Sequence, residues 1–286
     1  MNDFHLPPQT HIGYAHLYTA NLARSLNFYA DKLGFQQIDN VDNAVTLSAD
    51  GHTPHILLTE HPDWDPKPAR STGLYHVAIR LPNRQSLAHT FKRLVSLRYP
   101  FGGFSDHMVS EALYLNDPDG NGLELYRDRP RDEWQYVDNQ VQMSLEALDV
   151  EKLLREADDT PWTAIDPATD IGHVHLHIAD LEQAQAFYVD LLGFELSVDW
   201  RGQGVIFVAA GGYHHHIGLN IWGGQQPQPP HTLGLHNFTV NVPDAATLDT
   251  LCERFHEAAV KIETQVDGSL FVHDPVGNAV LLVNRN

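Results

Sequence analysis

Residues 11–35 begin with alternating polar and apolar positions and then change to a helical spacing of apolar residues. Alternation is typical of a half-buried strand. The apolar residues that follow it recur on one face of a helix: Leu22, Leu26, Tyr29 and Leu33. Gly34 comes next, and glycine is the residue most suited to end a helix. The pattern predicts one strand followed by one helix.

This pattern is repeated along the chain. Residues 11–35, HIGYAHLYTANLARSLNFYADKLGF, match residues 170–194, DIGHVHLHIADLEQAQAFYVDLLGF. A second pair of matching segments begins at Thr72 and Leu233, and each is followed by a similar turn, in NDPDGNGLELY and HDPVGNAVLLV. Because self-similarity of this kind indicates duplicated structural units, the chain is predicted to consist of two similar halves, each a tandem pair.

Each predicted helix is followed by short β-like runs with Gly or Pro between them, such as NAVTLSA, HILLTE, GVIFVAA and HIGLNIW. The repeating unit is therefore predicted to be a βαβββ module. The expected first half, 1–130, contains modules 10–66 and 72–130, and the expected second half, 170–286, contains modules 170–224 and 232–286. Residues 131–169 fit no module and are expected to form a linker with a short acidic helix within 145–157.

Composition narrows the class of protein. The chain has 286 residues, of which 42% are hydrophobic, so it can bury one large core or two modest ones. Its 18 Lys and Arg against 37 Asp and Glu give a net charge of −19, which would repel nucleic acids and anionic lipid surfaces. We therefore expect no nucleic-acid partner, while a homo-oligomer is left open.

Targeting signals and disulfides are also not expected. The first residues, MNDFHLPPQT, lack the pattern of an export signal, and no run approaches the roughly 20 apolar residues of a membrane helix. The single cysteine, Cys252, excludes a disulfide framework and fits a reducing compartment. These features predict a cytoplasmic protein with no membrane partner.

The modules and their motifs resemble the vicinal-oxygen-chelate superfamily, which includes glyoxalase I, bleomycin-resistance proteins and extradiol ring-cleaving dioxygenases. The resemblance covers nearly the whole chain outside the linker. It implies an α+β fold in which four βαβββ modules form two paired, cupped mixed β-sheets with flanking helices. It also implies a divalent metal held by a first-strand residue from each of two paired modules and a last-strand carboxylate.

The first-strand position was located by counting back seven residues from the Asp or Asn that opens each helix. This gives His76 and His173 in the two middle modules, but Tyr14 and Asn237 in the outer two. The carboxylate position after the DPxGN turn is Glu124 in the second module and Leu281 in the fourth.

The predicted metal ligands are therefore His76, Glu124 and His173. Two imidazoles and one carboxylate form the facial triad that leaves coordination positions open on Fe(II), with Mn(II) as the alternative metal. By resemblance, glyoxalase I sites use two carboxylates per metal, which this set lacks. Since the three ligands come from the second and third modules, these modules are expected to pair, leaving the first to pair with the fourth.

A competing assignment uses His16 with His76 and Glu124, which keeps the site within the first half. His175 and His177 share a strand face with His173, and we interpret them as ordinary strand histidines with satisfied hydrogen bonds.

The resemblance also suggests catalytic residues. The run His215-His216-Ile217-Gly218-Leu219 is similar to the strand that carries the acid–base histidine of extradiol dioxygenases, which selects His215. Alternation along that strand would turn His214 and His216 to the opposite face. Tyr114 lies ten residues before Glu124, the separation typical of the family's substrate-contacting tyrosine, and His107 lies near its second histidine.

These residues together suggest an Fe(II)-dependent extradiol dioxygenase of the catechol 2,3-dioxygenase-like subgroup, with a catechol and dioxygen as substrates. His215 would act as acid and base, since an imidazole exchanges protons readily near neutrality. Two alternatives remain from the same fold: a metal-dependent glyoxalase-like lyase, isomerase or thiol transferase, and a non-catalytic small-molecule-binding protein.

Overall fold

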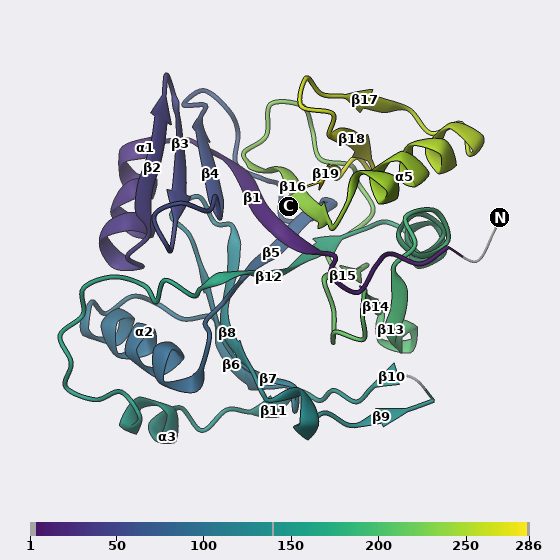
Figure 1. The fold of residues 1–286 in the computed structure, drawn as a ribbon. Helices are drawn as coiled ribbons and strands as arrows, with labels where there is room; N and C mark the ends of the chain where they lie inside the picture. The colour runs from purple at the N-terminus through teal and green to yellow at the C-terminus, as the bar shows by residue number, and fades with distance from the viewer. Residues whose placement is uncertain (1–3, 139, 285–286) are drawn as a thin grey trace.

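The computed structural model describes residues 4–138 and 140–284, and it has the expected α+β architecture (Figure 1). The first module contains β1 (His11–Thr19), α1 (Leu22–Leu26) with a π-helical turn (Asn27–Lys32), β2 (Gln36–Val41), β3 (Ala44–Ser48) and β4 (Ile56–Glu60). The second contains β5 (Gly73–Arg80), α2 (Arg84–Ser96), β6 (Gly103–Asp106), β7 (Ser110–Asn116) and β8 (Gly122–Asp128).

The two modules of the second half have the same order of elements. The third contains β12 (Asp170–His177), α4 (Leu181–Gln185) with a π-helical turn (Ala186–Leu191), β13 (Glu195–Trp200), β14 (Val205–Ala209) and β15 (Ile217–Asn220). The fourth contains β16 (Gly234–Val242), α5 (Ala245–Glu257), β17 (Ile262–Thr264), β18 (Leu270–His273) and β19 (Ala279–Asn284). Short 3-10 turns cover Arg131–Glu133 and Arg201–Gln203.

Each module helix begins at the Asp or Asn from which the first-strand position was counted. The side chains of Asn21, Asn83, Asp180 and Asp244 each accept a hydrogen bond from the backbone N–H three residues further on. This bond satisfies one of the amide groups that a helix leaves without a partner at its start. The Asp or Asn from which the first-strand position is counted is therefore the N-cap of the module helix.

The strands form two large sheets, and each sheet combines modules from different halves of the chain. Within the described residues one sheet has the order β11-β6-β7-β8-β5-β12-β15-β14-β13, joining the second and third modules. The other has the order β17-β18-β19-β16-β1-β4-β3-β2, joining the fourth and first. We call these the 2–3 sheet and the 1–4 sheet. The module pairing predicted from the ligand positions is confirmed.

The first strands of paired modules meet antiparallel at the centre of each sheet. In the 2–3 sheet β5 pairs with β12, so that His76 lies opposite His175 and Ala78 lies opposite His173. In the 1–4 sheet β1 pairs with β16, and His16 lies opposite Asn237. β5 and β12 run side by side through the middle of the molecule in Figure 1.

Buried tyrosine–aspartate pairs connect the two sheets within each half. The Tyr29 hydroxyl donates to Asp117 over 3.0 Å, and the Tyr188 hydroxyl donates to Asp274 over the same distance. Each tyrosine belongs to one module's helical segment, and each aspartate opens the DPxGN turn of the next module. The duplication thus preserves a packing contact as well as a strand order.

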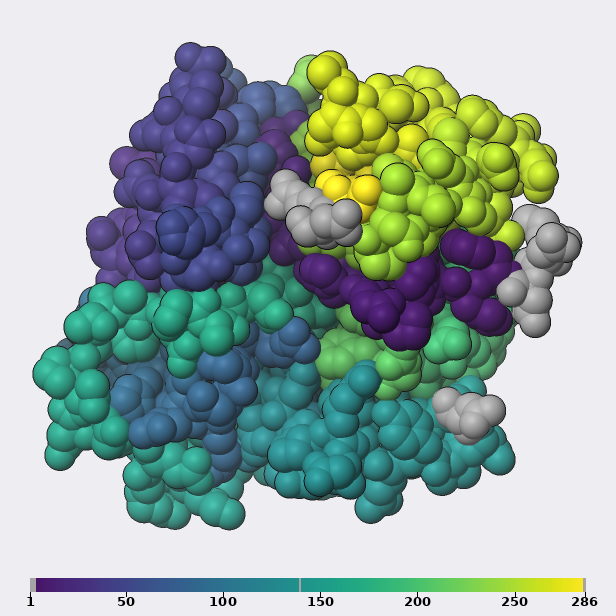
Figure 2. All heavy atoms as spheres, in the orientation of Figure 1, coloured from purple at the N-terminus to yellow at the C-terminus, as the bar shows by residue number. Residues whose placement is uncertain are grey.

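Residues 131–169 are more structured than the predicted linker. They contain a small hairpin of β9 (Tyr136–Val137) and β10 (Gln140–Val141), the edge strand β11 (Glu146–Ala147) and α3 (Val150–Arg155). The helix is shorter than the predicted 145–157 because residues 146–147 pair with β6 instead. In Figure 2 the green-teal later part of this segment lies against the blue surface of the second module, where α3 packs on α2. Among the helices within the described ranges, none has the length and apolar character that a membrane span requires.

Candidate metal centre and active site

The three predicted metal ligands meet on one face of the 2–3 sheet. His76 comes from β5, Glu124 from β8 and His173 from β12. The strand register places Ala78 between Glu124 on one side and His173 on the other. Strands two positions apart are separated by about 10 Å. The small side chain of Ala78 therefore leaves room for the two longer side chains to approach each other above it.

The ligand atoms of the trio are close together and buried. The Nε2 atoms of His76 and His173 lie 3.1 and 3.2 Å from Oε2 of Glu124, and they lie 3.4 Å from each other. The exposed fractions of these residues are 5%, 3% and 1% for His76, Glu124 and His173. In the described part of the chain, this is the trio whose ligand atoms all fall within 4.8 Å of one another.

The electrostatics of the trio favour an ionised Glu124 beside a neutral His173. Burial alone would raise the pKa of Glu124, but the adjacent His173 and His76 outweigh it and hold that pKa well below its usual range. Burial lowers the pKa of His173 to about 4, against a smaller opposing effect of Glu124. At neutral pH the site offers the ionised carboxylate of Glu124 and the neutral imidazole of His173, beside the Nε2 atom of His76.

This donor set fits a divalent metal of the Fe(II) type. Two imidazoles and one carboxylate are the ligands of the facial triad, in which three coordination positions stay open. The Nδ1 atom of His173 is buried and has no hydrogen-bond partner in the structure, whereas its Nε2 atom faces Glu124 and His76. His76, Glu124 and His173 would therefore hold the metal through Nε2, Oε2 and Nε2.

The competing ligand His16 lies on the other sheet. Its Nε2 atom is 2.8 Å from the Thr59 hydroxyl, and its ring packs edge-on against Tyr18 and His236. Among the described residues, His16 does not form a cluster of possible metal ligands with His76 and Glu124. Tyr14, Asn237 and Leu281 occupy the corresponding positions of the 1–4 sheet.

A cavity of about 690 Å³ opens beside the trio. Its wall includes His76, Glu124 and all three predicted catalytic residues: His107, Tyr114 and His215. Exposed aromatic side chains, Tyr75 and Trp222, also line it. Met143 and Leu145 come from residues 131–169, so the segment predicted to be only a linker forms part of the wall.

Tyr114 and His107 form a hydrogen-bonded pair at this cavity. The Tyr114 hydroxyl is 2.7 Å from His107 Nε2, and His107 Nδ1 is 2.9 Å from the Ser144 carbonyl oxygen. Because a carbonyl can only accept, Nδ1 carries a proton, and in the tautomer with one ring proton Nε2 accepts from Tyr114. Burial, followed by Glu124, raises the Tyr114 pKa well above its usual value, so the phenol stays protonated. His107 therefore orients Tyr114.

His215 lies against the trio, but its local structure differs from the prediction. The histidine triplet precedes β15, which begins at Ile217, so strand alternation does not separate its members. The His215 ring is 4.0 Å from that of His173, between centroids, and it lines the cavity. His214 does not turn to an opposite face: its Nδ1 atom is 2.7 Å from His215 Nδ1. His216 accepts a hydrogen bond from the Ala210 backbone N–H.

His175 was interpreted as a satisfied strand histidine, and this is wrong. It is buried, lines the cavity and has an Nε2 atom without a hydrogen-bond partner in the structure. His177 does conform, because its Nδ1 atom lies 2.7 Å from the Asn220 side-chain oxygen. The alternation of side chains along β12 places His175 on the same face as His173, and this pattern indicates that His175 lies near the trio.

Both the sequence and the fold have counterparts in known proteins. The family model described as "Glyoxalase/Bleomycin resistance protein/Dioxygenase superfamily" matches residues 11–125 and 170–282, and the chain belongs to this superfamily. The chain is also 46% identical over 276 residues to a protein of Bacillus subtilis (strain 168) named catechol-2,3-dioxygenase. That alignment covers 95% of this chain and 96% of the relative.

Solved structures support the fold. A putative dioxygenase from Bacillus subtilis subsp. subtilis str. 168 superposes with a TM-score of 0.66 and 12% identity, covering 96% of this chain and 85% of that one. Glyoxalase I from Zea mays superposes with a TM-score of 0.58 and 17% identity, covering 96% and 92%. Because proteins with different chemistry share this fold, the site must decide the reaction.

Proposed function

We propose that the protein is an Fe(II)-dependent extradiol ring-cleaving dioxygenase that acts on catechol or a substituted catechol. The observation that carries the proposal is the buried trio of His76, Glu124 and His173, of which His76 and Glu124 line the cavity. Its single carboxylate favours this reaction over the glyoxalase-like alternative. The name of the 46% identical relative points to the same reaction.

Iron held by the trio would supply the redox chemistry between a catechol and dioxygen. The cavity residues supply binding and proton handling. His215 would accept a proton from a substrate hydroxyl and later return it. Burial, with smaller effects of the surrounding histidines, lowers the pKa of His215 well below its usual value, so the ring is neutral and able to accept.

Tyr114 would hold the substrate rather than exchange protons with it. Its hydroxyl proton is directed to His107, so the phenol oxygen presents lone pairs toward the cavity and can accept a hydrogen bond from a catechol hydroxyl. His107 is kept in this orientation by the Ser144 carbonyl, which belongs to the segment that also covers one side of the cavity.

The test is metal analysis of anaerobically purified protein followed by oxygen uptake with catechol. The expected result is about one Fe(II) per chain after loading, and one dioxygen consumed per catechol with a ring-opened product. Mn(II) in place of Fe(II) would revise the metal only. A metal-loaded protein that consumes no oxygen with any catechol, but isomerises or adds a thiol to another substrate, would refute the proposal.

A further inference from the structure

His215 is the first member of a buried chain of contacts that leads away from the cavity. Its Nδ1 atom is 2.7 Å from His214 Nδ1, and His214 Nε2 is 2.9 Å from Oδ1 of Asp128. His214 has no exposed surface. Asp128 is the last residue of β8, the strand that carries Glu124. The series of contacts therefore ends on the same strand as a predicted metal ligand.

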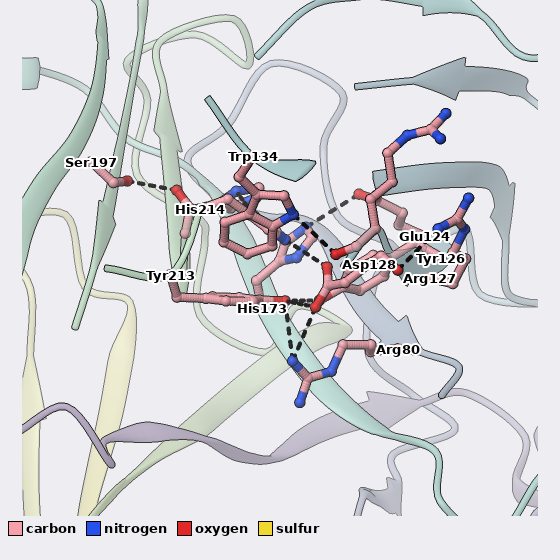
Figure 3. A network of polar contacts seen from close by, with 12 residues as sticks. Arg80, Glu124, Tyr126, Arg127, Asp128, Trp134, His173, Ser197, Tyr213 and His214 are labelled. Atoms are coloured by element: carbon pink, nitrogen blue, oxygen red, sulfur yellow. Dashed lines mark hydrogen bonds and ion pairs between the residues drawn. The ribbon is translucent and has the colours of Figure 1, made fainter. Parts of the chain in front are cut away.

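Two hydrogen-bond donors fix the position of Asp128, the last residue in this series of contacts. Oδ2 of Asp128 accepts from Arg80 over 3.2 Å and from the Tyr213 hydroxyl over 2.8 Å, as Figure 3 shows. The Ser197 hydroxyl donates to the His214 carbonyl, and the Trp134 ring packs 5.3 Å from the His214 ring. These contacts leave Asp128 Oδ1 directed at His214.

These contacts determine where the ring protons lie. A carboxylate only accepts, so His214 Nε2 carries a proton. Arg80 forms an ion pair with Asp128, and the His214 tautomer that donates through Nε2 has a lone pair on Nδ1. That lone pair accepts the proton of His215 Nδ1. The opposite nitrogen of His215, Nε2, is then unprotonated on the edge away from His214.

We propose that Asp128 and His214 are positioning residues that hold His215 in the tautomer with an unprotonated Nε2 available to the substrate. The inference rests on the proposed function, because it assumes that His215 is the acid–base residue. In this tautomer Nε2 of His215 can accept a proton from the substrate. Asp128 and His214 themselves touch neither the cavity nor the trio's ligand atoms.

Asp128→Asn tests this directly, because the arrangement of donors predicts how the new amide must lie. Arg80 and Tyr213 both donate to the Oδ2 position, so the oxygen of the amide remains there and its NH2 group faces His214. His214 Nε2 must then accept, which moves its proton to Nδ1 and forces His215 to carry its own proton on Nε2. We expect kcat with catechol to fall about 100-fold, with KM and metal content changed less than about 2-fold.

The effect should pass through His215. In a double-mutant cycle, His215→Ala lowers kcat by about 100-fold, and Asp128→Asn added to it lowers kcat by less than about 2-fold more. Ring-nitrogen NMR spectra of the metal-free protein give a readout besides activity. They should show His215 Nε2 unprotonated in the wild type and protonated in Asp128→Asn.

Three results would overturn the inference: full activity of Asp128→Asn, a further 100-fold loss in the His215→Ala background, or a wild-type His215 that is protonated on Nε2. If Asp128→Asn does not fold, the comparison of His214→Asn with His214→Leu replaces it. Asn keeps an acceptor near the Nδ1 position and should be at least about 10-fold more active than Leu; equal activities contradict the inference. Absence of oxygen uptake by the wild type would instead refute the proposed function.

Discussion

The 2–3 sheet and the 1–4 sheet are built from the same module, and they differ at the few positions where side chains face the first-strand site. His76, Glu124 and His173 of the 2–3 sheet correspond to Asn237, Leu281 and Tyr14 of the 1–4 sheet. The residues that the sheets share include the helix caps and the buried tyrosine–aspartate pairs. The proposed metal ligands are therefore three side chains on a module that also forms a sheet without them.

One shared feature is a histidine that acts as a structural acceptor. His55 Nδ1 accepts from the Ala49 backbone N–H in the 1–4 sheet, and His216 Nδ1 accepts from the Ala210 N–H in the 2–3 sheet, each over 3.1 Å. Both are buried. High histidine content therefore has two separate causes in this chain, a structural one present in both sheets and a chemical one present in only one.

The largest expected effect comes from removing the carboxylate that only the 2–3 sheet has. Glu124→Gln should lower oxygen uptake with catechol on the order of 1000-fold, the equivalent of about 4 kcal/mol, because the metal loses its anionic ligand. Leu281→Gln at the corresponding position of the 1–4 sheet is the matched control and should leave uptake within about 2-fold. Similar losses in both variants would contradict the difference between the sheets.

The shared histidines predict a pH dependence of the metal-free protein. Burial lowers the pKa of His216 to about 3, and burial likewise lowers the pKa of His55. The unfolded chain binds these protons below about pH 6.5 while the folded chain does not, so stability is lost as the pH falls from 6.5 toward 3. His216→Asn, which keeps an acceptor but does not titrate, should reduce the slope by about 1.4 kcal/mol per pH unit.

The measurement is urea unfolding at a series of pH values, with His55→Asn as the companion variant. A smaller reduction is expected there, and an unchanged slope in both variants would show that the histidines are protonated in the folded state.

A second difference concerns the space beside the first-strand site. A methyl group on Gly122 would lie 2.1 Å from the Tyr75 carbonyl oxygen, whereas the corresponding residue of the 1–4 sheet is already Ala279. Gly122→Ala should therefore lower the free energy of unfolding by about 2 kcal/mol through overpacking. The reverse change, Ala279→Gly, should cost only about 1 kcal/mol. Urea titration measures the free energy of unfolding of both variants. Equal losses would show that the two positions are equivalent and would contradict the prediction.

The smallest expected effects distinguish His175 from His16, which occupy corresponding positions. His175 Nε2 has no partner in the structure, so His175→Leu should leave the stability of the metal-free protein unchanged or slightly raised while it increases KM for catechol. His16→Leu removes the contact with Thr59 and should cost about 1 kcal/mol of stability without changing KM. Thermal unfolding and steady-state kinetics on both variants test this. A loss of stability in His175→Leu together with a raised KM in His16→Leu would contradict the prediction.

Much of this arrangement could be predicted from the sequence because the repeat supplies an internal reference. Asn83 and Asp180 cap their helices, and counting back from them located His76 and His173 at the first-strand position that the resemblance to the superfamily implied. The distribution of ligands between the modules then predicted which modules pair. Both steps rely on local patterns that are copied four times.

The parts that could not be predicted are contacts between segments that no repeat relates. The Ser144 carbonyl reaches His107, and Met143 lines the cavity, but residues 131–169 have no second copy to compare. The link between His214 and Asp128 depends on a loop conformation before β15, where alternation was assumed. Periodicity locates a residue on an element, whereas such contacts depend on how distant elements pack.

The central claim, that one metal is held by the 2–3 sheet, is tested most directly by metal content per chain in two variants. Anaerobically loaded His16→Ala should retain about one Fe(II) per chain, as the wild type does, because His16 lies on the 1–4 sheet. His173→Ala should retain almost none while remaining folded. Retention of iron in His173→Ala together with its loss in His16→Ala would contradict the account.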